Sequence, residues 1–161
     1  MKIKVSLNSA SIDDAIKQLE AYQQKVDKLG DKIVHRLTDS GTEQAKEMAM
    51  YMNAYDSGEL VNGIIPEYRG KNGYIVSTAP HSAFVEMGTG VVGAQNPNPN
   101  NSVPGWVYDV NGHGEAGWVY FKEKDGKYHW TKGIPSRPYM YDTAQILRDS
   151  IPDVAKEELE K

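Results

Sequence analysis

Residues 11–52, SIDDAIKQLEAYQQKVDKLGDKIVHRLTDSGTEQAKEMAMYM, decide the fold of this chain. Apolar and small residues recur there in steps of three and four: Ile12, Ala15, Ile16, Leu19, Tyr22, Val26, Leu29, Ile33, Leu37, Gly41, Ala45, Met48 and Met52. This spacing is typical of a helix with one apolar face. It predicts either one long helix bent near Gly30, or two helices folded back on each other at Leu29 and Gly30.

A single helix over this run would be about 60 Å long, at about 1.5 Å per residue. That length exceeds the width of a compact domain of 161 residues, so we expect such a helix to pack on something besides its own domain. Ser11 is its predicted N-cap. Upstream, residues 2–7, KIKVSL, alternate polar and apolar side chains and predict a half-buried strand.

The composition narrows the class of protein. The chain length suits a single domain over 1–161 with its own core. The absence of cysteine excludes disulfides, thiolate nucleophiles and cysteine-ligated zinc. The first residues lack the apolar run of a signal peptide, and no apolar stretch approaches the ~20 residues of a membrane span. We expect a soluble protein made in the cytoplasm, and its net charge of -4 disfavours tight, sequence-neutral binding to nucleic acid.

After the helix, the pattern changes from helix to strand. In NAYDSGELVNGI, residues 53–64, Asp56 and Glu59 have the spacing of a capping box, which predicts a short helical turn. The stretches IIPEYRG and GYIVSTA, joined at 70–73, have the β-branched and aromatic content of a hairpin.

Residues 91–133 have a different composition and form an insert of loop plus β-hairpin. The stretch VVGAQNPNPNNSVPG predicts an irregular, exposed loop that adds little to stability. A two-residue turn at Asp125-Gly126 would place Phe121 opposite Trp130, and Lys122 opposite His129. The insert holds all three tryptophans, Trp106, Trp118 and Trp130. Buried, they would form a small satellite core, which we favour; exposed, they would mark a partner surface.

The segment HSAFVEMGTG, residues 81–90, places an acid in an apolar run that stops on Gly-Thr-Gly. Burial would raise the pKa of Glu86 and suit it to acid or base catalysis. Alternatively, Glu86 lies on the solvent side of a short strand or helical turn, or accepts hydrogen bonds from backbone N–H groups of the following turn. We favour this second, structural alternative.

The histidines supply one further candidate site. His113, Glu115 and His129, with His81 or His35, have the nitrogen and oxygen donors of a metal site. No His pair has the i, i+4 spacing of a metal-hydrolase helix, and the sequence has neither a G-x-S-x-G elbow nor a phosphate loop. A metal-dependent hydrolase therefore stays an alternative function, as does a carbohydrate- or peptide-binding module that uses the Trp-rich insert.

Three motifs in order, YDSGELVNGI, HSAFVEMGTG and GIPSRPYMYDTA, followed by a charged terminal helix, resemble the tail-completion or head-tail joining proteins of long-tailed bacteriophages and prophages. That family carries Asp-(Thr/Ser)-Gly-x-Leu after a long helix, aromatic-Val-Glu-(Phe/Met)-Gly-Thr, and (Ala/Ser)-Arg-Pro-(Phe/Tyr)-(Leu/Met) opening the last helix. The matching positions here are Asp56, Gly58, Leu60, Glu86, Gly88, Thr89, Arg137 and Pro138. The insert at 91–133 departs from the family's shorter pattern.

The resemblance implies a structural virion protein without catalysis or cofactor. It implies a homo-oligomeric ring that matches the six-fold tail, contacts with tail tube or terminator proteins and with the head connector, and passage of DNA through the ring. The acidic net charge predicts that DNA passes without tight binding. Should the motifs meet in space, Arg137 is expected to pair with Glu86 and anchor the last helix, which Pro138 opens. That pairing would give Glu86 its structural role.

The fold class we expect is α+β. A long N-terminal helix or helix pair would pack on one antiparallel sheet, built from 61–79 and from strands near 84 and over 118–131. A C-terminal helix would begin near Pro138, and Pro152 would kink or end it.

Overall fold

A computed structural model of the protein describes residues 8–54, 58–100, 103–109, 111–122 and 124–160. The predicted strand 2–7 and the Asp56 position lie outside these residues. The elements are α1 (Ser9–Tyr51), α2 (Glu59–Asn62), β1 (Ile64–Arg69), β2 (Asn72–Ser77), α3 (Ser82–Met87), α4 (Gly90–Gln95), a 3-10 turn (Gly114–Ala116), β3 (Trp118–Lys122), β4 (Lys127–Thr131), β5 (Gly133–Ile134) and α5 (Tyr139–Leu159). The α+β prediction is confirmed.

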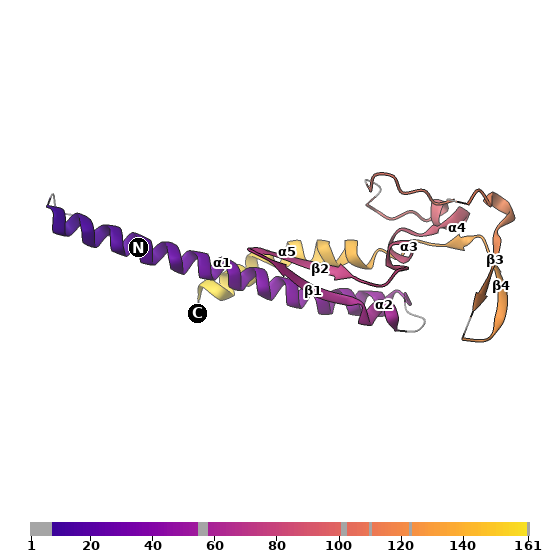
Figure 1. Ribbon diagram of the computed structural model, residues 1–161, viewed down its shortest axis with the longest axis horizontal. Coiled ribbons are helices and arrows are strands. Elements are labelled where there is room, and N and C mark those ends of the chain that lie inside the picture. Colours follow the sequence, from indigo (N-terminus) through magenta and orange to yellow (C-terminus); the bar gives the residue numbers. More distant parts are fainter. Residues whose placement is uncertain (1–7, 55–57, 101–102, 110, 123, 161) are drawn as a thin grey trace.

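Helix α1 is one continuous helix of 43 residues that passes through Gly30 without folding back (Figure 1). Of the two predicted arrangements, the single helix is the one adopted. Its N-cap is Asn8, whose side chain accepts the N–H of Ser11 at 2.9 Å, so the predicted cap at Ser11 was wrong. The part of α1 nearest the N-terminus projects beyond the rest of the molecule (Figure 1).

The C-terminal half of α1 forms the centre of the body. Helix α5 runs back along it, and the β1–β2 hairpin lies beside both (Figure 1). The face of α1 in this contact is made of small residues, and Gly41 shows why: a Cβ there would lie 2.5 Å from Leu147 and 2.6 Å from Ile75. Small side chains therefore let three elements approach closely. Near the far end of α5, Arg36 pairs with Glu157 and, at 3.0 Å, with Glu158.

The first hairpin follows the prediction, with Ile64 opposite Ser77, Arg69 opposite Asn72, and a turn at 70–71. Beyond it the predicted sheet was wrong. In the described residues, β1–β2 and β3–β4 form separate two-stranded sheets, and the segment near residue 84 is the helix α3. Helix α5 begins after Pro138 as predicted, but it continues through Pro152 to Leu159.

The register of the second hairpin differs from the prediction by two residues. Phe121 faces Tyr128 and Val119 faces Trp130. Strand β3 ends at Lys122 and β4 begins at Lys127, so the connection is longer than a two-residue turn. A shift of two preserves the alternation of faces, so Val119, Phe121 and Trp130 still share one face as expected.

The stretch predicted as an irregular loop is partly structured. Residues 90–95 form α4, and Asn98 is buried, so the prediction of an irregular, exposed loop is wrong at these positions.

Candidate functional site

The three sequence motifs meet in one hydrophobic core. Leu60 of the first motif, Val85 of the second and Tyr139 of the third are all buried in the cluster that also contains Ile64. Ala45 and Ala49 of α1 also belong to this cluster. Motifs spread over about half of the chain thus act together on the packing of the body.

Glu86 caps the N-terminus of α5 from a different helix. Its Oε2 accepts the N–H of Met140 at 2.9 Å, and its Oε1 accepts the N–H of Tyr141 at 3.1 Å. These are the second and third residues of α5, whose free N–H groups an N-cap side chain normally satisfies. The cap residue itself is Pro138, which forms no side-chain cap. A carboxylate at this end also complements the positive end of the helix dipole.

Further hydrogen bonds hold this junction together. Asn98 donates its side-chain N–H to the backbone oxygen of Glu86 at 2.8 Å and to Oε1 at 3.2 Å. Ser136 donates its hydroxyl to the same backbone oxygen at 2.6 Å, and the N–H of Arg137 donates to the carbonyl of Val85 at 2.9 Å. The last turn of α3 is therefore joined to the start of α5 and to the loop after α4.

The predicted ion pair between Glu86 and Arg137 was wrong. Among the described residues no ion pair joins them, and the carboxylate oxygens accept backbone N–H groups instead. Arg137 contributes its backbone to the junction. The expectation that Glu86 anchors the last helix is nevertheless met, by backbone capping in place of a guanidinium.

Burial raises the pKa of Glu86 above its ordinary value of 4.5. The hydrogen bonds from Met140, Tyr141 and Asn98 act in the opposite direction, and the nearby Asp142 carboxylate adds to the increase. Since the bonds come from fixed backbone donors, the arrangement orients α5. Both carboxylate oxygens are thus used to cap the N-terminus of α5.

Gly88 and Thr89 hold the turn after α3 against the strand β5. Gly88 has φ 81°, and a Cβ there would lie 2.7 Å from the backbone N of Ser136, so both conformation and space require glycine. The Thr89 hydroxyl accepts the N–H of Ile134 at 3.2 Å. Gly58, also with positive φ, precedes α2 and brings Leu60 into the core.

The histidines do not form the alternative metal site. His113 stacks on Trp118, Glu115 pairs with Lys132 at 2.8 Å, and His129 pairs with Asp125 at 2.8 Å. His35 stacks on Tyr68, and His81 lies 3.7 Å from Glu59. In the part of the chain that the structure describes, no three such side chains come together in a metal-binding group.

The tryptophans divide between two environments. Trp106 packs on Phe84, with ring centroids 5.7 Å apart, and Trp118 is half-buried beside His113. The third, Trp130, is on the exposed face of the second hairpin. The favoured satellite core was therefore wrong for that face, whose side chains are 51–77% exposed: Val119, Phe121, Tyr128 and Trp130.

Sequence reasoning missed Asn98 and Ser136 as members of the junction. Asn98 lies in a stretch whose Asn and Pro content indicates a loop, and only its side-chain bonds to Glu86 distinguish it. No helix among the described residues has the length and apolar character needed to cross a membrane. Comparison of the chain with protein-family models, with curated proteins and with solved structures finds no match.

Proposed function

We propose that this chain is a structural subunit at the head-tail junction of a long-tailed bacteriophage, acting by assembly into a ring and without catalysis. The role of Glu86 carries the proposal. The residue that best fits a catalytic acid or base uses both carboxylate oxygens to cap α5. The segment HSAFVEMGTG, which contains Glu86, thus has a structural role in the body of the protein.

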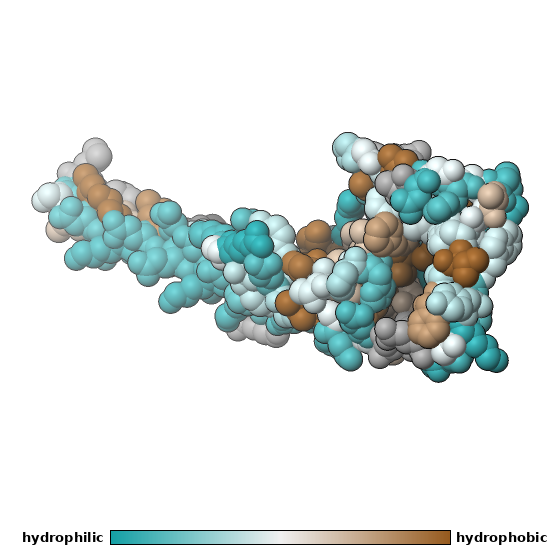
Figure 2. All heavy atoms as spheres, turned by 45° about the vertical axis from the view of Figure 1, so that its right-hand side comes forward, coloured by the Kyte–Doolittle hydropathy of each residue, from teal (hydrophilic) through white to brown (hydrophobic). Residues whose placement is uncertain are grey.

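The surface also favours assembly. About half of the exposed large apolar side chains among the described residues lie on two elements that extend from the body, the N-terminal part of α1 and the β3–β4 hairpin. Figure 2 shows hydrophobic residues at the far end of α1 as well as over the body. Apolar surface on projecting elements is typical of sites that contact other proteins.

The order of the three motifs resembles that of tail-completion and head-tail joining proteins. This resemblance supports the head-tail junction as the place where the chain assembles. On this proposal the ring matches the six-fold tail, contacts tail tube or terminator proteins on one side and the head connector on the other, and surrounds DNA without holding it. The virion is then its location.

We expect the isolated protein to be monomeric or weakly associated, and to form its ring on the end of the tail. Segments that project from a body often order fully only against a partner. Light scattering at micromolar concentration measures this. A stable closed ring of purified protein would contradict assembly on a template.

Deletion of the gene from the phage or prophage that encodes the chain tests the proposal directly. We expect separate heads and tails in electron micrographs, and recovery of joined particles when the wild-type chain is supplied in trans. The matched control is a supplied chain with Glu43→Gln, a change on the exposed face of α1 that should also restore joining. Normal yields of joined, infectious particles after deletion would refute the proposal.

The exposed aromatic face of β3–β4 favours one second candidate, a carbohydrate- or peptide-binding module. Trp130 is 59% exposed there, a position from which an indole can stack on a sugar ring. Titration with oligosaccharides or extended peptides, followed by tryptophan fluorescence, tests this function. Saturable binding that Trp130→Ala abolishes would favour it, and no binding would dismiss it.

A further inference from the structure

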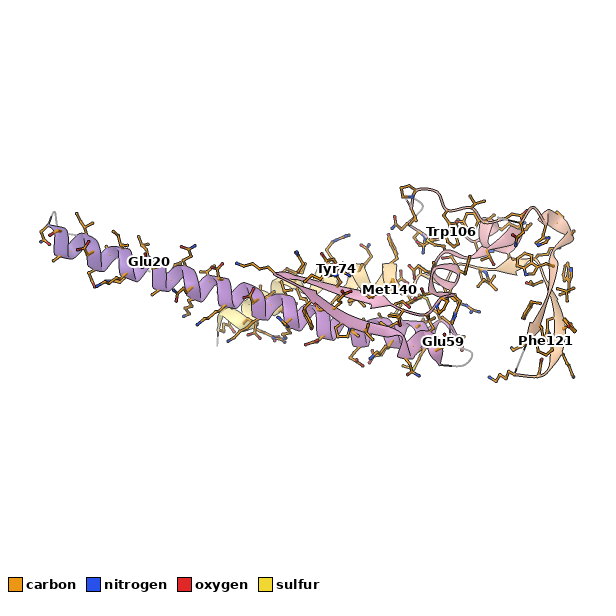
Figure 3. All side chains as sticks on the ribbon, viewed as in Figure 1. Glu20, Glu59, Tyr74, Trp106, Phe121 and Met140 are labelled. Atoms are coloured by element: carbon orange, nitrogen blue, oxygen red, sulfur yellow. The ribbon has the colours of Figure 1, made fainter. Side chains whose placement is uncertain are left out.

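The projecting part of α1 carries an apolar stripe that packs against no other element among the described residues. We call Ile12, Ile16, Leu19, Tyr22 and Val26 the tip stripe; their side chains are 43–55% exposed. Figure 3 labels Glu20 on this part of α1, away from the hairpins and from α5. Such a large apolar surface on a helix costs free energy in water, so it marks a contact.

The tip stripe is not an extension of the face that α1 buries in the body. The buried face contains Thr38, Gly41, Thr42, Ala45 and Ala49. At about 100° of rotation per residue, its direction differs from that of the tip stripe by about a quarter of a turn. The tip stripe is therefore a second apolar face with its own direction.

The body of the same chain has an apolar groove. The groove has a volume of about 460 Å³ and lies between α1, β2 and α5, lined by Val34, Leu37, Ile75, Met140, Leu147 and Ile151 among others. Along α5 it extends from Met140 to Ile151, about 17 Å at 1.5 Å per residue, while the tip stripe extends about 21 Å. The two surfaces agree in length and in chemistry.

The tip of α1 cannot reach the groove of its own chain. Val34 and Leu37 of α1 line the groove, and α1 continues from them toward the tip as an unbroken helix (Figure 1). Bringing the tip back would require a break in α1. A helix from another molecule can lie there, as amphipathic helices lie in apolar grooves of their partners.

We propose that the tip stripe of one copy of the chain lies in the groove of a second copy. The contact joins two different surfaces, so each bound copy still offers a free tip or a free groove, and repetition by rotation closes a ring. This inference deepens the proposed function, because it names the contact between subunits. Only the closure of this contact into a ring rests on the proposed function.

The tip stripes of two copies could instead pair with each other as a coiled coil, but the residues beside the stripe do not favour this arrangement. The spacing of Ile12, Ala15, Leu19, Tyr22, Val26, Leu29 and Ile33 follows a heptad. In a coiled coil the positions beside that seam usually carry opposite charges. Here Lys25 and Lys32 flank one side, whereas Gln23 and Gly30 flank the other, so the acids that would pair with these lysines are missing from the seam.

The absence of cysteine from the chain allows a clean cross-linking test. Two single variants are purified: Leu19→Cys in the middle of the tip stripe and Ala144→Cys, an exposed residue that lines the groove. They are treated with a short bismaleimide, alone and mixed, at about 100 μM, where a weak contact is populated. We expect a cross-linked pair in the mixture alone. The matched control is Gln24→Cys, exposed on the opposite face of α1, which should not cross-link to Ala144→Cys.

Three outcomes would overturn the proposal. Cross-linking of Leu19→Cys to itself would show tip-to-tip pairing and overturn it, as would equal yields from Leu19→Cys and Gln24→Cys. A Leu19→Asp variant should weaken association at least tenfold in sedimentation, with the melting temperature of the body unchanged, because the tip does not pack on the body. Unchanged association would also overturn it.

The test separates this inference from the proposed function. Failure of the cross-link, together with loss of joined particles on gene deletion, would overturn the contact and leave the head-tail role intact. A specific cross-link, together with normal particles after deletion, would establish the contact between copies and refute the head-tail role.

Discussion

Replacing Glu86 by alanine should lower the free energy of unfolding by about 2 kcal/mol. The change removes the acceptor of two backbone N–H groups, those of Met140 at 2.9 Å and Tyr141 at 3.1 Å. Each of the two part-buried donors left without an acceptor costs about 1–3 kcal/mol, and this cost already includes the loss of the helix cap. Relief from burying a carboxylate, visible in the raised pKa of Glu86, offsets part of this sum.

Glu86→Gln should cost about half as much, because an amide keeps one acceptor oxygen but turns an N–H toward the second donor. The matched control is Glu43→Ala, which removes an exposed acid that pairs with Lys46 at 2.8 Å on α1 and should cost below about 0.5 kcal/mol. Urea unfolding followed by far-UV circular dichroism measures all three variants. A Glu86→Ala value within the error of the Glu43→Ala value would refute the capping role.

Three further predictions concern charge. A double-mutant cycle on Glu86 and Arg137 should give a coupling energy near zero, since no ion pair joins them; coupling above about 1 kcal/mol would contradict this. Because burial raises the folded pKa of Glu86, proton binding at this carboxyl favours the folded state, and this contribution to stability is fully present below pH 4.5. It is lost as pH rises through the folded pKa. The free energy of unfolding of wild type, measured relative to that of Glu86→Gln in pH-dependent unfolding, should therefore fall across that window. The free protein should not bind duplex DNA at physiological ionic strength, given its net charge of -4, and micromolar, salt-sensitive binding in an anisotropy titration would reverse that expectation.

Elements with local signals could be predicted from the sequence. The three-and-four spacing of α1 and the β-branched content around the 70–71 turn are properties of neighbouring residues, so helix and hairpin were both recognisable. Pro138 likewise indicated the start of α5 because its ring suits a helix end.

The capping by Glu86 could not be predicted, for a physical reason. Its donors are backbone N–H groups of Met140 and Tyr141, 54 and 55 positions away, and every residue except proline carries such a group. The sequence shows only side chains, and among them Arg137 was the plausible partner. The bond that forms depends on how α3 and α5 are placed by the shared core around Leu60 and Tyr139.

The second hairpin shows how a local signal can mislead. Asp125-Gly126 has the composition of a two-residue turn, yet the Asp125 side chain accepts the N–H of Lys127 at 3.0 Å and bonds to the His129 ring at 2.8 Å. With these bonds, the connection between β3 and β4 is longer than a two-residue turn. The prediction of the shared face survived because faces depend on alternation, which a shift of two preserves.

The continuity of α1 through Gly30 has a mechanical consequence. Arg36 ties the helix to Glu157 and Glu158 on one side of this residue, and Asp27 pairs with Lys71 at 3.0 Å on the other. Beyond Asp27 the helix projects toward its N-terminus like a cantilever (Figure 1). A sideways load at the tip of a cantilever produces its greatest bending moment at the root. Gly30 lies near that root, and a Cβ there would meet nothing within 4 Å, so packing does not require glycine. Because glycine is among the weakest helix formers, Gly30 lowers the resistance of α1 to bending near this root.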